Sequence, residues 1–293
     1  MIIDKSFIQM YCLIVKTVLR TSFIYENKSD GLGELNLNKS ASRVMDILTL
    51  ISTTKVPLGV SEISRELNIP KSSTFDVLDT MVKKGFLELN SETKTYRLGL
   101  KSFEVGSTYL LNTDLHRVAA PFLEKLMEQT GETAFLAVES DGEIVYLDKM
   151  ETPSTLRTTA TLGTRSPMYS TGLGKAILAA YPDSKVFELM KNKTFIKRTS
   201  KSITNINELI ADLNRIRKRG YSIDNRENED EVFCIACPIL NENNLPIAAI
   251  SVSGLAMKMT NEMIKRNSRF IIDAALKISK RLGYRKKSLN FNP

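Results

Sequence analysis

Residues 57–73 read PLGVSEISRELNIPKSS, and this stretch decides how the first part of the chain folds. Ser61 is placed to cap a short helix over residues 62–67, because a serine hydroxyl can accept a hydrogen bond from a free amide of the first turn. An Ile and a Leu four positions apart share the buried face of that helix. Residues 68–70, Asn-Ile-Pro, then break the helix, and a new one is expected to begin at about Lys71.

The segments on both sides of this stretch show the spacing of amphipathic helices. From Lys39 onward, apolar residues recur every three or four positions, at Val44, Ile47, Leu48 and Ile51. A third helix is expected from about Lys71 to Lys84, with an inward face made of Thr74, Val77, Leu78 and Met81. Gly85 follows where a left-handed C-terminal cap belongs.

A β-hairpin is expected after the third helix. Residues 86–89 and 94–98 read as strands, and the polar residues 90–93 between them read as a turn. Three short helices followed by a hairpin are the layout of a winged helix-turn-helix, which presents its recognition helix to the major groove of DNA. A small helical domain that binds another protein is the alternative, and the tight turn and the hairpin favour DNA.

The composition is that of a globular protein with about two domains. Of 293 residues, 42% are hydrophobic and 25% are charged, and the net charge is +8. The basic excess lies at two places, since residues 38–98 carry nine Lys or Arg against seven Asp or Glu, and residues 277–287 carry six without an acid. This charge is compatible with an anionic partner such as nucleic acid, but it does not identify one.

The cysteine content and the hydropathy favour a cytoplasmic protein. Cys12, Cys234 and Cys237 are too few for a secreted disulfide scaffold. No uncharged apolar run reaches the length of about 18 residues that a membrane span needs, so no membrane association is expected. The closest stretch, residues 7–25, is interrupted by two basic residues.

The remainder of the chain predicts an α+β domain around an antiparallel sheet, because hairpins alternate with inserted helices. The expected strands cover residues 133–138, 143–149, 156–161, 234–240 and 247–253. The expected helices cover residues 100–111 and 115–129, a segment starting near Thr171, and residues 206–219 and 262–282. Pro121 lies inside the second of these, so that helix either begins or bends there.

Two sets of motifs resemble one known family. The first set is residues 57–73 with KGFL at 84–87 and YRLG at 96–99. The second set follows in the same order, with TGETA at 130–134, YLDK at 146–149, YSTGLGKA at 169–176, GY at 220–221, CIA at 234–236 and AAISVSG at 248–254. Together they resemble the IclR family of transcriptional regulators over about residues 39–283.

The resemblance implies a domain order and a set of partners. It implies an N-terminal extension of unknown role, a winged helix-turn-helix, a linker helix, a GAF-like effector-binding domain and a basic tail, at residues 1–37, 38–99, 100–113, 114–283 and 284–293 respectively. It implies a repressor that binds double-stranded DNA and a small-molecule effector, as a homodimer or homotetramer. No cofactor, catalytic residue or metal ligand is expected.

The outward face of the third helix supplies the expected DNA contacts, which are Lys71, Ser72, Ser73, Phe75 and Asp76. Lys71 and the hydroxyls at the helix N-terminus suit phosphate, whereas Ser73 and Phe75 are candidates for base contacts. Asp76 is a departure, because many relatives carry Arg near this position, and it either accepts from cytosine or forms an intramolecular ion pair. Clamps on the DNA backbone are expected from Arg43 and Arg65, and from Lys94 and Arg97 on the wing, with solvated surface charge as the alternative.

The expected effector site combines a strand with a glycine-rich helix start. Ser251 and Ser253 are two positions apart, so both hydroxyls face one side of an apolar strand. The helix after Thr171 opens with glycines that leave amide groups free for an anion. The resemblance implies a pocket formed by Gly172, Leu173, Asp224, Cys234, Ser251 and Ser253. It implies an organic acid or a sugar-derived acid as the ligand.

Other chemistries are excluded on spacing. Cys234 and Cys237 form a CxxC, but residues three apart on a strand point to opposite faces, which argues against a redox or metal site. His116 is the only histidine and lies in a helix without a nucleophile motif, so we expect a surface histidine and not a hydrolase. The acid-rich segment 224–231 reads as a solvated turn and not as a metal site. An enzyme and a pure protein-interaction module are the alternative functions.

Overall fold

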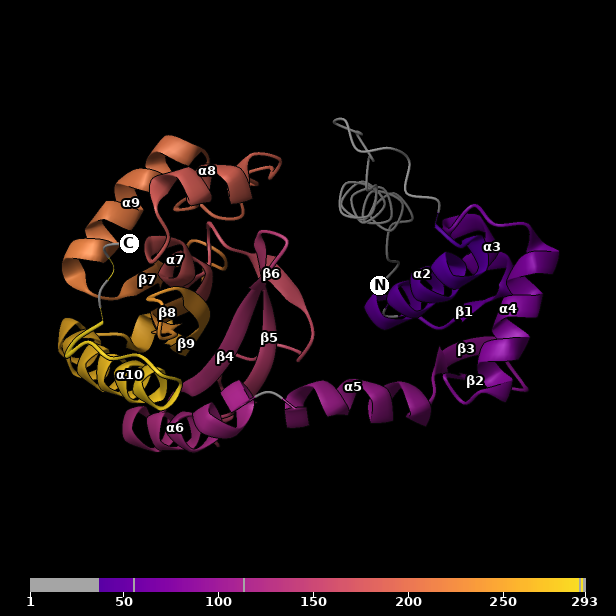
Figure 1. The fold of residues 1–293 in the computed structure, drawn as a ribbon, viewed down its shortest axis with the longest axis horizontal. Helices are drawn as coiled ribbons and strands as arrows, with labels where there is room; N and C mark the ends of the chain where they lie inside the picture. Colours follow the sequence, from indigo (N-terminus) through magenta and orange to yellow (C-terminus); the bar gives the residue numbers. More distant parts are fainter. Residues whose placement is uncertain (1–36, 55, 113, 290, 292–293) are drawn as a thin grey trace, which may run out of the picture. The chain divides into compact units, whose positions relative to one another are not determined.

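The winged helix-turn-helix pattern is present in the computed structural model, which describes residues 37–54, 56–112, 114–289 and 291 (Figure 1). Its first helices and strands are α2 (Lys39–Thr53), β1 (Leu58–Gly59), α3 (Val60–Glu66), α4 (Lys71–Lys83), β2 (Leu87–Leu89) and β3 (Thr95–Leu98). The three strands form an antiparallel sheet in the order β1-β3-β2. The prediction for the N-terminal extension and for Cys12 lies outside the described residues, apart from Leu37.

The boundaries of the short helices correct one expectation. Ser61 does not cap the second helix, because α3 already begins at Val60. The reason is that Leu58 and Gly59 pair with β3, which sets the start of the helix two residues earlier than the sequence indicates. The first turn is closed instead by Glu62, whose carboxylate accepts the Gly59 amide at 3.1 Å. The left-handed residue after α4 is Gly85, with φ +77°, as predicted.

The first compact unit ends at Phe103 and has a small core of its own. The fully or almost fully buried side chains come from α2, α3, α4 and the two wing strands: Ile47, Ile63, Leu78, Met81, Leu87 and Tyr96. Their spacing is the one that the sequence shows, so the hydrophobic pattern accounts for the packing of the three helices against the wing.

The second compact unit, residues 104–293, contains a six-stranded antiparallel sheet in the order β6-β5-β4-β9-β8-β7. The strands are β4 (Thr133–Ser140), β5 (Glu143–Met150), β6 (Arg165–Pro167), β7 (Ser222–Asn225), β8 (Val232–Leu240) and β9 (Pro246–Leu255). The helices are α5 (Leu100–Asn112), which starts in the first unit, then α6 (Asp114–Thr130), α7 (Gly172–Ala179), α8 (Asp183–Met190), α9 (Ile206–Arg219) and α10 (Asn261–Arg281). The α+β class predicted from the sequence is confirmed, and α6 continues through Pro121.

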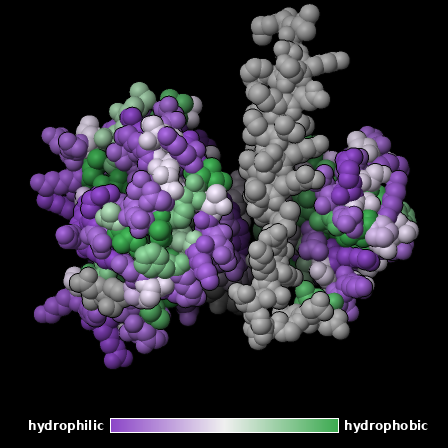
Figure 2. All heavy atoms as spheres, turned by 90° about the horizontal axis from the view of Figure 1, so that it is seen from above, coloured by the Kyte–Doolittle hydropathy of each residue, from purple (hydrophilic) through white to green (hydrophobic). Residues whose placement is uncertain are grey.

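Helices cover both faces of this sheet, α6 and α10 on one and α7, α8 and α9 on the other (Figure 1). Alternate residues of β8 belong to the two faces: Ile235 and Cys237 pack with α6 and α10, whereas Ala236 packs with α7. The two cysteines therefore point to opposite faces, as the spacing predicts. The outer surface visible in Figure 2 is mainly hydrophilic, with apolar side chains in small groups.

Some expected and observed elements differ. The strand predicted over residues 156–161 is wrong, because this segment is irregular. Thr158 shows why. Its hydroxyl donates to the Ser253 carbonyl at 2.8 Å, and its carbonyl accepts from the Thr133 hydroxyl at 3.0 Å. Side-chain hydrogen bonds therefore attach this segment to β9 and β4 in place of strand pairing. The sequence analysis missed β1, β6, β7 and α8, which are short. No helix in the described ranges has the length and apolar content that spanning a bilayer requires.

We predict that Leu78→Ala lowers the free energy of unfolding of the first unit by about 2–5 kcal/mol, because Leu78 is 0% exposed and its truncation leaves a cavity. Amide hydrogen exchange of residues in α2 and α4 measures this loss. Phe75→Ala, on the same helix but 55% exposed, is the control and should change the stability by less than about 0.5 kcal/mol. Equal losses for the two variants would contradict the packing described.

Candidate DNA-binding and effector-binding sites

The recognition helix α4 turns its polar side away from the core. Thr74, Leu78 and Met81 are buried, and this fixes the helix so that Lys71, Ser72, Phe75 and Asp76 are exposed and Ser73 is half-buried. The residues named from the sequence as DNA contacts on this helix therefore occupy one accessible side of it.

The N-terminus of α4 keeps its first amides free. Pro70 precedes the helix, and no side chain caps it. The amides of Lys71, Ser72 and Ser73 have no acceptor among the residues that the structure describes. Free amides, the helix dipole and the Lys71 ammonium give this helix start the properties of a phosphate-binding group.

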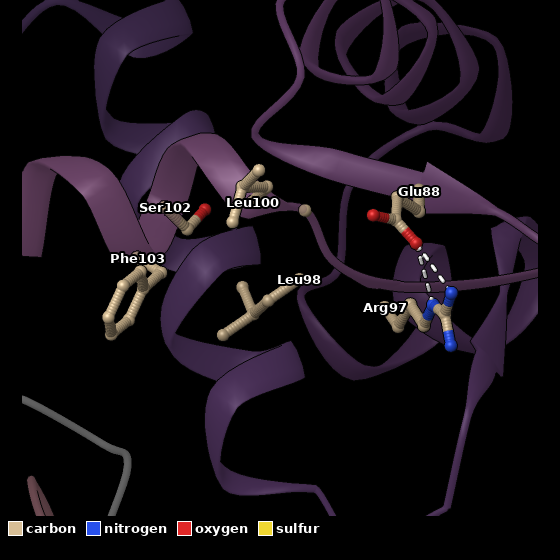
Figure 3. Close-up of a pocket in the computed structure, with 7 residues that line it drawn as sticks. Glu88, Arg97, Leu98, Leu100, Ser102 and Phe103 are labelled. Carbon is tan, nitrogen blue, oxygen red and sulfur yellow. Dashed lines mark hydrogen bonds and ion pairs between the residues drawn. The ribbon is translucent and has the colours of Figure 1, made fainter.

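The other basic residues expected to contact DNA differ in their solvent exposure and in their ion pairing. Arg65 and Lys94 are exposed, and Arg43 is half-buried. Arg97 on β3 is bound to Glu88 on β2, with Nε and Nη2 2.8 and 2.6 Å from Oε2 (Figure 3). Arg97 would have to exchange this partner before it could hold a phosphate.

The Asp76 carboxylate is exposed, and no cation of the described residues lies within ion-pair distance of it. The ion pair considered from the sequence is therefore absent in that part of the chain. The carboxylate is free to accept a hydrogen bond from an amino group.

A depression of about 540 Å³ lies where the wing meets α5 (Figure 3). Its floor combines the Glu88–Arg97 pair with three exposed apolar side chains, Leu98, Leu100 and Phe103. It contains no unpaired charge, so it does not resemble a site for an acidic ligand. It marks the start of α5 as an apolar surface.

The residues expected to bind the effector meet on the α7 side of the large sheet. Strand pairing places Asp224, Cys234, Ser253 and Thr133 in one row across β7, β8, β9 and β4. The next row on the same face contains Ser222, Ala236, Ser251 and Phe135. Side chains that are direct neighbours in such rows lie about 5 Å apart, so a buried sheet face that could be wholly apolar carries a cluster of polar groups.

The N-terminus of α7 packs directly on this polar cluster. A Cβ added at Gly172 would lie 2.9 Å from the Cys234 sulfur, so only glycine permits this approach. Thr171 caps the amide of Gly174 at 3.2 Å. The amides of Gly172 and Leu173 have no acceptor among the described residues, and they lie at the positive end of the helix dipole.

Ser251 is the unpartnered polar group of the cluster. The residue is 0% exposed, and its Oγ makes no hydrogen bond of good geometry in the described ranges, since the Cys234 thiol beside it is only a weak hydrogen-bonding group. Leaving a buried hydroxyl unpaired costs about 1–3 kcal/mol, and such a group is expected to have a partner when the site is filled. Ser222, in the same row, is in contrast satisfied by the Gly172 carbonyl at 2.6 Å.

The sequence analysis missed Lys175, which lies one turn into α7 and is 0% exposed. Its Nζ is 2.8 Å from Asp212 Oδ2 on α9 and 2.5 Å from Glu227 Oε2 in the segment after β7. Arg215 binds the other oxygen of Asp212 at 3.0 Å. The sequence does contain a signal for Lys175, because the lysine lies inside the apolar run GLGKAILA. A lysine in such a run is expected to be buried, and a buried ammonium needs carboxylate partners.

Burial and charge shift the titration of these groups. Burial, with the neighbouring Glu227 carboxylate as the second cause, raises the pKa of Asp224 to about 7 against the opposing pull of backbone amides and Lys175. Burial also raises the pKa of Cys234, to about 12, so its thiol is neutral. Burial opposes ionisation of Asp212, but the attraction and hydrogen bond of Lys175, aided by Arg215, lower its pKa.

The comparison with known proteins decides the family. Residues 40–91 match the model of the IclR helix-turn-helix domain, and residues 107–280 match that of the bacterial transcriptional regulator IclR C-terminal domain. The transcriptional repressor IclR of Escherichia coli is 31% identical over 243 residues, which cover 82% of this chain and 89% of the repressor. The chain belongs to the IclR family of transcriptional regulators.

Solved structures agree with this assignment of the IclR-family chain. The crystal structure of the Thermotoga maritima IclR has 35% sequence identity and a TM-score of 0.69, covering 84% of this chain and 99% of that one. An IclR homologue from Microbacterium hydrocarbonoxydans, crystallised in complex with 4-hydroxybenzoate, shares the fold at 24% identity and a TM-score of 0.72, covering 83% and 98%. These relatives are transcription regulators and not enzymes, so the prediction of a non-enzymatic, DNA-binding regulator is confirmed.

One expectation about this IclR-family chain needs correction. The segment 224–231 is not simply a solvated turn, because Asp224 is buried and Glu227 is held by Lys175. His116 is partly exposed, with 31% of its side chain accessible, and its Nε2 lies 3.1 Å from Asp148 Oδ2.

We predict that Lys175→Met destabilises the protein by about 3–5 kcal/mol, because removing the ammonium leaves two buried carboxylates without their cation. Urea unfolding followed by circular dichroism measures the loss. A triple variant, Lys175→Met with Asp212→Asn and Glu227→Gln, removes all three charges and should recover most of it. A single-variant cost below about 1 kcal/mol would show that the ion pairs do not hold α7, α9 and segment 224–231 together.

Proposed function

We propose that this IclR-family regulator is a repressor whose binding to operator DNA is changed by a small organic acid or sugar-derived acid bound beside α7. The observation that supports the ligand site best is the unpartnered Ser251 hydroxyl, buried beside the free amides at the start of α7. The two amides and the hydroxyl are donors of the kind that a carboxylate needs.

The DNA contacts divide by chemistry. Lys71, Ser72 and the free amides at the start of α4 bind phosphate and fix the register of the helix in the major groove. Ser73, Phe75 and Asp76 reach base edges, where Phe75 meets a thymine methyl and Asp76 accepts from cytosine. Arg43, Arg65, Lys94 and Arg97 clamp the DNA backbone, with Arg97 leaving Glu88 to do so.

A second copy of the chain completes the DNA-binding form, as a homodimer or homotetramer. The exposed apolar residues Leu100, Phe103 and Val105 of α5 support this proposal, because a helix face of this kind is buried in an assembly. Two recognition helices would then meet half-sites about 34 Å apart, or a multiple of this. The protein acts in the cytoplasm, where its DNA is.

The ligand acts through α5, the helix that starts in the first unit and continues into the second. A ligand shifts an equilibrium only if it binds two states with unequal affinity. The proposed states differ in the spacing of the two recognition helices, and the filled site favours the spacing that does not match the operator. Segments 100–113 and 114–283 are thus the linker and the effector domain.

We predict that Lys71→Glu combined with Arg65→Glu weakens binding to the fragment upstream of the protein's own gene by more than about tenfold. The loss of two phosphate contacts should also make the salt dependence of log K shallower by about two. Fluorescence anisotropy between 50 and 200 mM salt gives both quantities. Lys125→Glu with Lys191→Glu, which are exposed but lie in the second unit, is the matched control. Unchanged binding by the first variant would point to a module that does not read DNA.

We predict that Ser251→Ala removes the response of operator binding to an added acid without lowering stability. The hydroxyl has no hydrogen-bond partner of good geometry to lose and only the weakly bonding Cys234 thiol beside it, so its removal costs little stability. Anisotropy in the presence of a screen of small monocarboxylates, together with thermal unfolding, measures the two effects. Ser268→Ala, buried on α10, is the control that should keep the response. A retained response in Ser251→Ala would place the ligand elsewhere.

A further inference from the structure

One buried carboxylate near the proposed site has no cation of its own. Lys175 and Arg215 between them neutralise Asp212 and Glu227. Asp224 is 3% exposed and receives only backbone hydrogen bonds, from the amide of Glu227 at 2.7 Å and from that of Asn228. Arg219 on α9 adds a third positive charge near Asp212 and Glu227. Among the described residues Asp224 is the carboxylate of this group that has no ion pair.

Among the titratable groups that surround it, Asp224 is the one whose pKa lies near neutral pH. Glu227 in the same segment repels its charge, and Lys175 on α7 attracts it, while burial outweighs both and raises its pKa to about 7. Cys234 on β8 and Tyr146 on β5 also face it, and the pKa of each is raised by burial to about 12, so both are neutral. Near neutral pH Asp224 therefore exchanges between its protonated and its ionised form.

A ligand carboxylate would add a further negative charge to this cluster. Its natural position is at the amides of Gly172 and Leu173 and the Ser251 hydroxyl, and Gly172 lies against Cys234, the direct strand neighbour of Asp224. Two ionised carboxylates on either side of Cys234 in a buried site repel each other, and a proton on one of them removes the repulsion. A protonated carboxyl also becomes a hydrogen-bond donor.

We propose, on the basis of the function proposed above, that Asp224 determines which effectors this site accepts. The site takes a monocarboxylate only together with a proton on Asp224, whose hydroxyl donates a hydrogen bond to an oxygen of the ligand. A dicarboxylate is rejected because its second charge would add to that of Asp224, which has no ion-pair partner among the described residues. A neutral polyol has no need of the proton and would bind as well or better when Asp224 is ionised.

The first measurement needs no ligand. In the full-length protein labelled with ¹³C at the aspartate carboxyl groups, Asp224 is identified by the signal missing from Asp224→Asn, and its shift is followed from pH 4 to 9. We expect a midpoint near 7, and a midpoint below about 5 would overturn the proposal. Asp141→Asn, on the exposed turn between β4 and β5, is the matched control and should leave that signal unchanged.

The second measurement uses acetate, lactate, benzoate and 4-hydroxybenzoate as probes, with succinate and glycerol for comparison. Calorimetry at pH 6 and pH 8 should show each bound monocarboxylate about tenfold weaker at pH 8, since the protonated fraction falls by this factor around a pKa of 7. In Asp224→Asn the difference should shrink below about twofold. Succinate should not bind at either pH.

The outcomes separate this proposal from the one on which it rests. Binding of a monocarboxylate with equal affinity at both pH values, or binding that strengthens at pH 8, overturns the proton coupling and leaves the effector site intact. If Asp224 titrates near 7 but no monocarboxylate binds, the proposed class of effector is wrong, and the coupling is wrong with it.

Discussion

The effector unit depends on the close approach of α7 to β8, which exists because residue 172 has no side chain. The space that a Cβ would need is already filled by the Cys234 sulfur. This contact brings the positive end of α7 next to the polar rows of the sheet. It also carries Lys175, one turn further along, into a fully buried position. The position of the free amides and of Lys175 therefore depends on the glycines of this turn, Gly172 against Cys234 and Gly174 against the Met168 backbone.

Burying Lys175 has consequences for segments far apart in the sequence. An ammonium withdrawn from water needs counter-charges with good geometry, and the chain supplies Asp212 from α9 and Glu227 from the segment after β7. The same segment carries Asp224, whose carboxylate accepts from the Glu227 amide. Asp224 itself lies in β7, where pairing with Cys234 sets its position, and the Lys175–Glu227 ion pair fixes the loop whose amide binds it. This arrangement leaves it free to exchange a proton.

Sequence patterns predicted the parts of the fold that depend on hydrophobic spacing. The faces of α4, the opposite orientations of Cys234 and Cys237 and the shared face of Ser251 and Ser253 all follow from helix and strand periods. The same patterns missed β6 and β7, because strands of three or four residues contain too little alternation to be recognised. They failed for residues 156–161, where side-chain bonds to Ser253 and Thr133 replace strand pairing. Lys175 was missed because its partners are 37 and 52 residues away and only the tertiary fold brings them together.

The proposed DNA site and the proposed effector site each use a helix N-terminus to bind an anion, but one N-terminus is exposed and the other is buried. The start of α4 is exposed beside Lys71, so its attraction for phosphate is screened by salt, and affinity has to come from many such contacts together. The start of α7 is buried, so an anion there interacts strongly with two amides and one hydroxyl. The same low dielectric magnifies every uncompensated charge nearby. A buried anion site with a surplus carboxylate therefore keeps its net charge unchanged on binding only when a proton joins the ligand, whereas the exposed site is neutralised by ions from the solution.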